Sequence, residues 1–297
     1  MKKTVAALAP GKINLALDIT GILPNGYHEV DTVLQAIDLC DTITITKQNK
    51  DGILISCDRP RVPCDETNHA YIAAIKFFET FGIDDRSIMI DICKRVPIQA
   101  GLGGGSADAA GVLVALNELY DVHADMQALC SIGVQVGADV PFCLLGGTRR
   151  ARGIGEQFEQ VPNLPDSILL IAQPSEGIST PESYRRYDQL SVVQRADVET
   201  LVCKLKFGDL KGTASHVGNV LEQAARLSEI PEIKKKMNQS GALGALMSGS
   251  GSAVFGIFDS RWKAKHCMRK LYSIANCVLL AHPIDHGAKV IRVNEYI

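Results

Sequence analysis

The chain has 297 residues, 46% of them hydrophobic, and its 31 basic and 33 acidic residues give a net charge of -2. A chain of this length buries a large core and can hold two domains of about 100 to 200 residues each. The charges balance, and the longest basic run is the stretch 234–236. Composition therefore excludes an extended surface for nucleic acid, and any site for an anion has to be formed by a few residues at one place.

The N-terminal part predicts strands. Residues 4–9 are apolar but end too early for a signal peptide, and no apolar run reaches the roughly 18 residues that cross a bilayer. We therefore expect a cytoplasmic protein with no membrane partner. Polar and apolar side chains alternate over residues 12–20, which predicts a half-buried strand with Lys12 and Asn14 on its polar face. Lys12, which follows a proline and a glycine, is either a solvated lysine or a cation placed by rigid backbone.

A turn at residues 21–26 leads into a second strand-like stretch that begins at Tyr27 and His28. An aromatic ring and a histidine on a turn are exposed enough to meet a ligand, although a lone turn histidine is more often structural. Residues 42–46 and 53–55 then alternate on either side of a polar turn. This pattern predicts an antiparallel hairpin.

Residues 65–68 can cap a helix that stops at Gly82. Its apolar spacing turns Ile72, Ile75 and Phe78 inward. The helix separates the predicted hairpin from the next strand.

A strand predicted over residues 88–92 leads into the stretch 101–105, in which four of five residues are glycine. Such a backbone reaches positive φ and brings its N–H groups close to an anion. Ser106 is a natural N-cap for the amphipathic run that follows, so the stretch predicts a phosphate cradle at a helix N-terminus. It is not a Walker loop, because no lysine follows the glycines, and as a dinucleotide fingerprint it has Ser106 in place of the third glycine. A glycine-rich turn without a ligand is the remaining alternative.

A helix predicted over residues 126–136 delivers Asp139 to the edge of an apolar run. Because desolvating a lone carboxylate costs several kcal/mol, Asp139 either caps or pairs structurally or is part of a site. A basic, glycine-rich stretch follows, whose three arginines either face phosphates or lie on a solvated hairpin: Arg149, Arg150 and Arg152. Prolines over 162–165 then mark a domain boundary.

The C-terminal part predicts strands, helices and a second glycine–serine loop. After a buried strand over 168–171, Pro181 starts a short helix that leaves Tyr184 free to stack on a ring. The loop within 246–258 either covers a phosphate or makes a tight hairpin turn. Further helices are predicted over 198–206, 217–227, 231–239 and 262–272, and a final strand over 278–280.

Nine cysteines include no Cys-x-x-Cys pair and lie mostly in apolar runs, which is typical of buried thiols in a reducing cytosol. A catalytic cysteine stays open, but packing is the commoner role of a free thiol. The histidines show no metal-ligand spacing, so no zinc site is predicted.

Several motifs together resemble those of the GHMP superfamily, which comprises galactokinases, homoserine kinases, mevalonate kinases and phosphomevalonate kinases. The motifs that carry the resemblance are Ala9-Pro-Gly-Lys-Ile-Asn-Leu15, Gly101-Leu-Gly-Gly-Gly-Ser-Ala-Asp-Ala-Ala110 and Met247-Ser-Gly-Ser-Gly251. Pro24-Asn-Gly-Tyr-His-Glu29 and Gly137-Ala-Asp-Val-Pro141 resemble the branch whose substrate is a cytidine diphosphate-linked methylerythritol. The resemblance implies an α/β (α+β) two-domain fold. An ATP-binding domain over 1–160 and a C-terminal domain over 161–297 would enclose the active site in the cleft between them.

The resemblance also implies roles for particular residues. Lys12 and Asp139 match the catalytic pair, and Asn14, Tyr27, His28 and Tyr184 match the substrate site around the cytosine and its ribose. The residues that match the ATP-phosphate loop are Pro97, Ala100, Gly101, Leu102, Gly103, Gly104, Gly105, Ser106 and Ala107. The chain departs from this branch in two places, with Pro-Gly-Lys for the more usual Pro-Ala-Lys and a tyrosine at 184 where some relatives have phenylalanine.

The implied reaction is ATP-dependent phosphorylation of the substrate's 2-hydroxyl in the non-mevalonate pathway to isoprenoid precursors. Asp139 would accept the hydroxyl proton, and Lys12 would offset the charge that develops on the oxygen. Mg²⁺ would bridge the phosphates, with Ser106 as one candidate ligand. Two alternatives stay open: another GHMP kinase, acting on homoserine or a mevalonate derivative, and a catalytically silent nucleotide-binding sensor. We expect a monomer or a homodimer.

Overall fold

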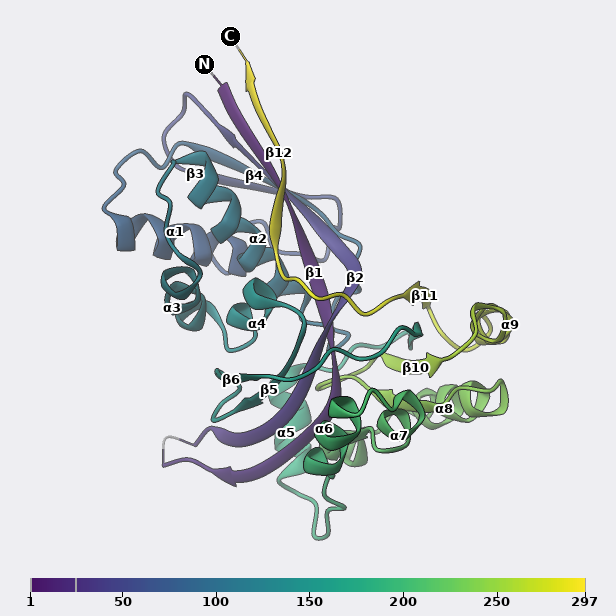
Figure 1. Ribbon diagram of the computed structural model, residues 1–297. Coiled ribbons are helices and arrows are strands. Elements are labelled where there is room, and N and C mark those ends of the chain that lie inside the picture. Colours follow the sequence, from purple (N-terminus) through teal and green to yellow (C-terminus); the bar gives the residue numbers. More distant parts are fainter. Residues whose placement is uncertain (1, 25, 297) are drawn as a thin grey trace.

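Two long strands, β1 (Lys2–Ile22) and β2 (His28–Lys47), lie side by side and reach into both halves of the molecule (Figure 1). The structure is a computed structural model that describes residues 2–24 and 26–296, so Asn25 of the tyrosine–histidine turn lies outside it. The antiparallel register of the two strands shifts between Pro10 and Lys12 and again further along. Such bulges bend a strand and re-aim its side chains.

The strand predicted over residues 12–20 is confirmed as part of β1, but it is not half-buried. Lys12, Asn14 and Asp18 on its polar face are only 5%, 3% and 7% exposed. Residues of the C-terminal half cover them: Ser248 contacts Asn14 and Arg195 contacts Asp18. Alternation shows which side chains share a face, but what covers that face is decided by distant parts of the chain.

The first sheet has the order β12-β1-β2-β4-β3, with β5 beside β2, β6 beside β5 and β8 beside β1. Its remaining strands are β3 (Ile53–Cys57), β4 (Ile88–Cys93), β5 (Thr148–Arg152), β6 (Gln157–Gln160), β8 (Gly218–Asn219) and β12 (Lys289–Tyr296). The hairpin predicted from residues 42–46 and 53–55 is wrong, because β4 lies between β2 and β3 and pairs with β3 in parallel. A short turn connects β2 and β3, but a later strand takes the place between them.

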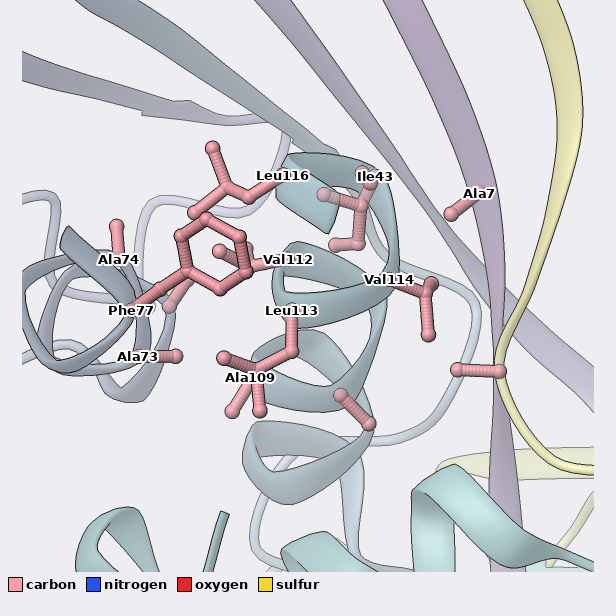
Figure 2. Close-up of a cluster of buried hydrophobic side chains, with 14 of the residues drawn as sticks. Ala7, Ile43, Ala73, Ala74, Phe77, Ala109, Val112, Leu113, Val114 and Leu116 are labelled. Carbon is pink, nitrogen blue, oxygen red and sulfur yellow. The ribbon is translucent and has the colours of Figure 1, made fainter. Parts of the chain in front are cut away.

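Helices α1 and α2 pack together against the first sheet and form much of its core (Figure 2). Asn68 caps α1 and Gly82 ends it in the left-handed region, as predicted. Its buried face, however, is Ala70, Ala73, Ala74, Phe77 and Phe78, and the predicted Ile72 and Ile75 are only partly buried. Small side chains let α1 approach α2 closely. The helices of this half are α1 (His69–Phe81), α2 (Gly104–Leu119), α3 (Met126–Val136) and α4 (Val140–Leu145).

The second sheet has the order β11-β7-β10-β9. Its strands are β7 (Ile168–Gln173), β9 (Gly244–Met247), β10 (Val254–Phe258) and β11 (Cys277–Ala281). The helices of this half are α5 (Thr180–Tyr187), α6 (Val198–Lys206), α7 (Leu210–Ser215), α8 (Glu229–Gln239) and α9 (Arg261–Leu271). The helix predicted over 217–227 is wrong, because β8 pairs with β1 there and only a short 3-10 helix, η1 (Val220–Ala224), follows.

The last strand, β12, follows β11 and returns to the first sheet, where it pairs with β1 near both chain ends (Figure 1). The sequence did not predict it, and β11 is therefore not the final strand. The mixed α/β class is confirmed. The division at 160/161 stays a prediction, with the addition that residues 289–296 pair with the first sheet. Among the residues that the structure describes, no helix is long and apolar enough to cross a membrane.

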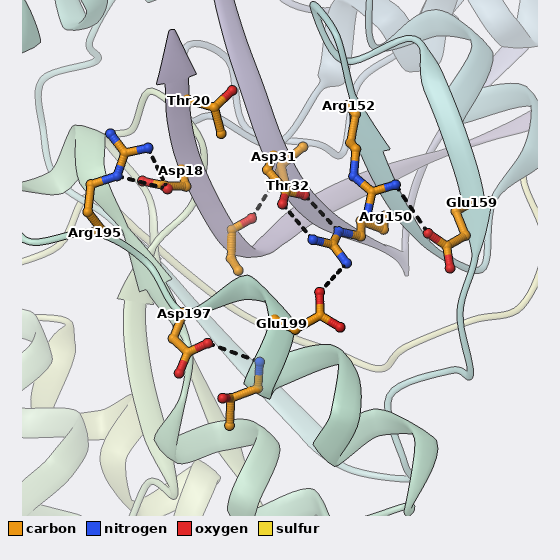
Figure 3. A network of polar contacts seen from close by, with 12 residues as sticks. Asp18, Thr20, Asp31, Thr32, Arg150, Arg152, Glu159, Arg195, Asp197 and Glu199 are labelled. Atoms are coloured by element: carbon orange, nitrogen blue, oxygen red, sulfur yellow. Dashed lines mark hydrogen bonds and ion pairs between the residues drawn. The ribbon is translucent and has the colours of Figure 1, made fainter.

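Arg150 connects the two halves (Figure 3). From β5 its guanidinium donates to both carboxylate oxygens of Asp31 on β2, at 2.8 and 2.7 Å, and to Glu199 on α6 at 2.8 Å. Arg152 pairs with Glu159 across the β5–β6 hairpin. Of the two alternatives for the three arginines, the structure therefore favours the hairpin, and it gives Arg150 a structural role.

All nine cysteines are free thiols. Cys143 and Cys267 are buried, whereas Cys64, Cys93 and Cys203 are exposed. The expectation of buried thiols is therefore wrong for those three, because an apolar neighbourhood in sequence does not always lie in the core.

Candidate active site

The glycine stretch ends a loop and starts α2. Gly103 is the N-cap, at φ 72°, and α2 begins at Gly104, so Ser106 lies inside the first turn and is not the predicted N-cap. Glycine makes the earlier start possible, because it adopts positive φ without steric cost. The first N–H groups of a helix have no partner within it, and here they belong to small residues that leave room for an anion.

The second glycine–serine loop packs directly on the first. A Cβ at Gly101 would lie 2.0 Å from the carbonyl oxygen of Ser248, so only glycine fits there. Ser248 Oγ donates to the Gly101 carbonyl at 3.0 Å, and the Ala253 N–H donates to the Ala100 carbonyl at 3.1 Å. The loop also joins β9 to β10 as a hairpin turn. The hairpin alternative is confirmed, and contact with a phosphate stays a prediction.

Lys12 lies beneath the first loop. The backbone N–H of Lys12 donates to the Leu102 carbonyl at 2.9 Å. A Cβ added at Gly103 would lie 3.0 Å from Cγ of Lys12. The ammonium group donates to Asn14 Oδ1 at 2.8 Å and lies 3.3 Å from Asp139 Oδ2. Asn14 in turn donates to Thr32 Oγ1 at 2.9 Å. The lysine side chain is only 6% exposed, so backbone and side chains both hold this cation in one place.

Asp139 occupies the N-cap position of α4, but its side chain makes no capping hydrogen bond. The interpretation as a structural cap is therefore wrong, whereas the alternative of a structural pair stays open, because Asp139 pairs with Lys12. Its carboxylate is 37% exposed and faces Lys12 at 3.3 Å. A partly solvated carboxylate that a buried ammonium holds in place, with one face open, can accept a proton from a hydroxyl group that approaches it.

His28 and α5 form the other end of the site. The His28 ring lies 4.7 Å from the Tyr184 ring and edge-on to Tyr187 at 6.3 Å. Burial raises the pKa of Tyr184 to about 12, so its hydroxyl stays protonated. His28 Nε2 lies 2.7 Å from Asp188 Oδ1, whereas Tyr27 is 60% exposed at the rim. Sequence reasoning missed Asp188, because no local pattern places it against His28.

A second lysine lies on the far side of the glycine loop. Lys94 Nζ donates to Asp41 at 2.5 Å, to Asp108 at 2.7 Å and to the Gly104 carbonyl at 3.3 Å. Burial alone would lower the pKa of Lys94, but the two carboxylates outweigh it and raise that pKa. Burial raises the pKa of Asp108 to about 8, against the lowering effect of Lys94, and Asp41 raises it further. Asp108, a charged residue among the small side chains in the first half of α2, was the signal that could have predicted this buried cluster.

One cavity of about 1010 Å³ connects these groups. All the predicted site residues line it except Ala107, which is fully buried behind the loop. Residues of both halves contribute, among them Asp139 from the first and Tyr184 and Gly249 from the second. His69 also lines the cavity, and burial lowers its pKa. The cavity is therefore a cleft between the halves, large enough for two ligands to meet at Lys12 and Asp139.

The described residues contain no group of three or more His, Cys, Asp or Glu side chains that could hold a metal ion. Ser106 lines the cavity at the first turn of α2. Mg²⁺ suits such a place, because it prefers oxygen ligands and is usually bound through substrate phosphates and few protein groups.

Comparisons with known proteins agree with this geometry. Residues 68–147 match the GHMP kinases N terminal domain, and residues 209–274 match the GHMP kinases C terminal domain. A 4-diphosphocytidyl-2-C-methyl-D-erythritol kinase of Clostridium novyi (strain NT) is 39% identical over 93% of this chain and 99% of its own length. The protein of that name from Caldicellulosiruptor bescii is 40% identical over 89% of this chain and 92% of its own.

Solved structures are similar over nearly the whole chain as well. A crystal structure of 4-(cytidine 5'-diphospho)-2C-methyl-D-erythritol kinase has a TM-score of 0.78 at 32% identity and covers 94% of this chain and 98% of its own. Homoserine kinase from Cytophaga hutchinsonii has a TM-score of 0.81 at 23% identity, with 97% of both chains covered. The second likeness shows the fold alone. The predicted GHMP kinase fold is confirmed.

Proposed function

The chain belongs to the GHMP kinases, in the family of the 4-diphosphocytidyl-2-C-methyl-D-erythritol kinases, and from this we propose that it uses ATP to phosphorylate the 2-hydroxyl of that cytidyl compound. The reaction would serve the non-mevalonate route to isoprenoid precursors. The observation that carries the proposal is the single cleft in which the glycine loop, the Lys12–Asp139 pair and the His28–Tyr184 rings meet.

Asp139 is the general base of the proposed reaction. Its carboxylate accepts the proton of the 2-hydroxyl as that oxygen forms a bond to the γ-phosphorus of ATP, and the bond from this phosphorus to the β,γ-bridging oxygen breaks to release ADP. Lys12, held 3.3 Å from Asp139, offsets the negative charge that develops on the attacking oxygen. Phosphoryl transfer gains most from such positioning and charge neutralisation.

The glycine loop holds the phosphate donor. The N–H groups at the start of α2 and the helix dipole face the β and γ phosphates. The Ser106 hydroxyl would be the protein's ligand to Mg²⁺, which, when bound, neutralises phosphate charge. Lys12 packs against the backbone of the same loop. The loop that holds the phosphate donor and the lysine that faces the acceptor hydroxyl are therefore fixed relative to each other.

The rings at the other end of the cleft recognise the cytidine. Tyr184 and Tyr27 offer faces on which a base can stack, and His28 offers a polar ring edge between them. Asn14 lies between this end and Lys12, within reach of the polar groups that follow the base.

A coupled assay of ADP release tests the proposal against its alternatives. We expect ADP release with 4-diphosphocytidyl-2-C-methyl-D-erythritol and Mg-ATP, and none above background with homoserine or mevalonate, which have no base to stack. Turnover of either small alcohol would instead identify another GHMP kinase. Nucleotide binding without ADP release on any of the three would identify a silent sensor.

A further inference from the structure

Asp188 and His28 form a pair that joins the two halves at the mouth of the cleft. Asp188 Oδ1 lies 2.7 Å from His28 Nε2. The histidine side chain is 13% exposed and the aspartate side chain 44%, so the ring is enclosed and the carboxylate reaches it from the solvent side. The rings of Tyr184 and Tyr187 on α5 contact the His28 ring, at distances of 4.7 and 6.3 Å between ring centroids. Helix α5 and its C-cap residue Asp188 therefore supply the two tyrosine contacts and the acidic contact of this ring.

The contact decides which ring nitrogen carries hydrogen. An ionised carboxylate only accepts hydrogen bonds, so His28 Nε2 has to donate. In the neutral ring the other nitrogen, Nδ1, is then a hydrogen-bond acceptor. Nδ1 has no hydrogen-bond partner among the residues that the structure describes, and His28 lines the cavity.

We propose that Asp188 is a positioning residue for the nucleobase: it keeps the hydrogen of His28 on Nε2 and so presents Nδ1 as an acceptor for the exocyclic amine of cytosine. The proposal rests on the proposed function, since the cytidyl group supplies the base. Cytosine has an amino donor where uracil has a carbonyl acceptor. An acceptor at Nδ1 would bind the first and repel the second, so Asp188 would determine base specificity without touching the base.

Nitrogen-15 NMR of the histidine rings in the unliganded wild-type protein tests the first half directly. At about pH 8 we expect the His28 ring to carry hydrogen on Nε2 and none on Nδ1. The signal is assigned by its loss in His28→Gln. Hydrogen on Nδ1, or on both nitrogens, would overturn the proposal, and this measurement on the wild-type protein does not depend on the identity of the substrate.

Kinetics of Asp188→Ala test the second half. We expect KM for the cytidyl substrate to rise about 10-fold with little change in kcat, and the preference over the matching uridyl compound to fall by about 10-fold, since one good base contact discriminates by roughly 1–3 kcal/mol. Asp188→Glu, which keeps a carboxylate on an exposed position, should restore most of the preference. Unchanged preference in Asp188→Ala would contradict the proposal.

The chain provides a matched control. His282 Nδ1 pairs with Asp38 Oδ2 at 2.8 Å, and the two side chains are 42% and 44% exposed. Asp38→Ala breaks this histidine–aspartate pair outside the cleft, together with the hydrogen bond that the His282 backbone N–H donates to Asp38 Oδ1, and should leave KM and base preference unchanged. If the wild-type protein does not phosphorylate the cytidyl substrate, the proposed function fails, whereas a wild-type kinase whose Asp188→Ala variant keeps its base preference refutes only the role of Asp188.

Discussion

Two lysines lie on either side of one glycine loop, and each faces acidic side chains, but their surroundings differ. Lys12 touches Gly103 and lies 3.3 Å from Asp139, whose side chain is 37% exposed. Lys94 reaches Gly104 and pairs with Asp41 and Asp108 at 2.5 and 2.7 Å, where no partner is more than 4% exposed. The same chemical groups thus form an open pair and an almost fully buried, sealed cluster, two members of which, Lys94 and Asp108, also line the cavity.

The difference separates a pair suited to a role in the reaction from a cluster suited to a structural role. A carboxylate that accepts a proton during turnover needs access to substrate and room to change its partner, which the open pair has. In the sealed cluster the ammonium group and both carboxylates are almost fully buried and pair with one another, so its arrangement favours holding the start of α2 over accepting a proton from a substrate. Asp41 also accepts the N–H groups of Arg95 and Val96, so the cluster anchors the segment before the loop too.

Breaking the sealed cluster should have the largest effect on stability. We expect Lys94→Met to lower the free energy of unfolding by about 3–5 kcal/mol, because it leaves buried carboxylates without their cation. Lys12→Met, by comparison, should cost at most about 1 kcal/mol, since its partner Asp139 is partly solvated. Urea unfolding of both variants checks this. Equal losses in the two would show that the cluster and the pair do not differ as proposed.

Removing the base from the open pair should have the largest effect on activity. Asp139→Asn keeps the shape but cannot accept the hydroxyl proton, so we expect kcat to fall at least about 100-fold. Calorimetry should find nearly unchanged affinity for the cytidyl substrate and an unchanged unfolding midpoint. Turnover close to that of the wild type would remove Asp139 from its proposed role.

The glycine that touches Lys12 allows a smaller test. Gly103 has φ 72°, so alanine there costs about 1–2 kcal/mol in backbone strain, and its Cβ would lie 3.0 Å from Lys12 Cγ. Gly208 has φ 63° with nothing within 4 Å of a Cβ. Both alanine variants should lose similar stability, but only Gly103→Ala should lose turnover, on the order of 10-fold, because Lys12 has to move. Equal activity in both would mean that the loop does not position the lysine.

Local patterns predicted most elements of this fold. The helices over 126–136 and 198–206 match α3 and α6, and the strand over 88–92 lies in β4. The errors in strand pairing are of long-range origin. Nothing near residues 42–55 indicates that β4 inserts between β2 and β3, and nothing near 289–296 indicates its pairing with β1.

The candidate site likewise has a part that the sequence predicted and a part that it did not. The motif resemblance placed Lys12, Asp139 and the glycine loop in one cleft, where the structure also has them. Asp188 and Lys94 lie outside the motifs, and although Asp108 lies within the glycine motif, its partner Lys94 comes from another part of the chain. Spacing in sequence cannot predict such contacts, since they depend on how the sheet and α5 pack.

The smallest predicted effect is a pH dependence confined to the sealed cluster. The pKa of Asp108 is raised from 3.8 to about 8, so the folded state holds a proton that the unfolded chain has lost. Stability from this group is therefore greatest below about pH 4 and is lost as pH rises toward 8.

Between pH 7 and pH 8 the wild type should lose about 1 kcal/mol from this source, and Asp108→Asn, which stays neutral, should not. Urea unfolding at the two pH values measures this difference. Asp41→Asn serves as the control, because it removes the negative charge that pairs with Lys94 at 2.5 Å, a loss that should destabilise at both pH values. If Asp108→Asn lost as much stability as the wild type over this interval, the sealed cluster would carry its full charge at neutral pH, as the open pair does.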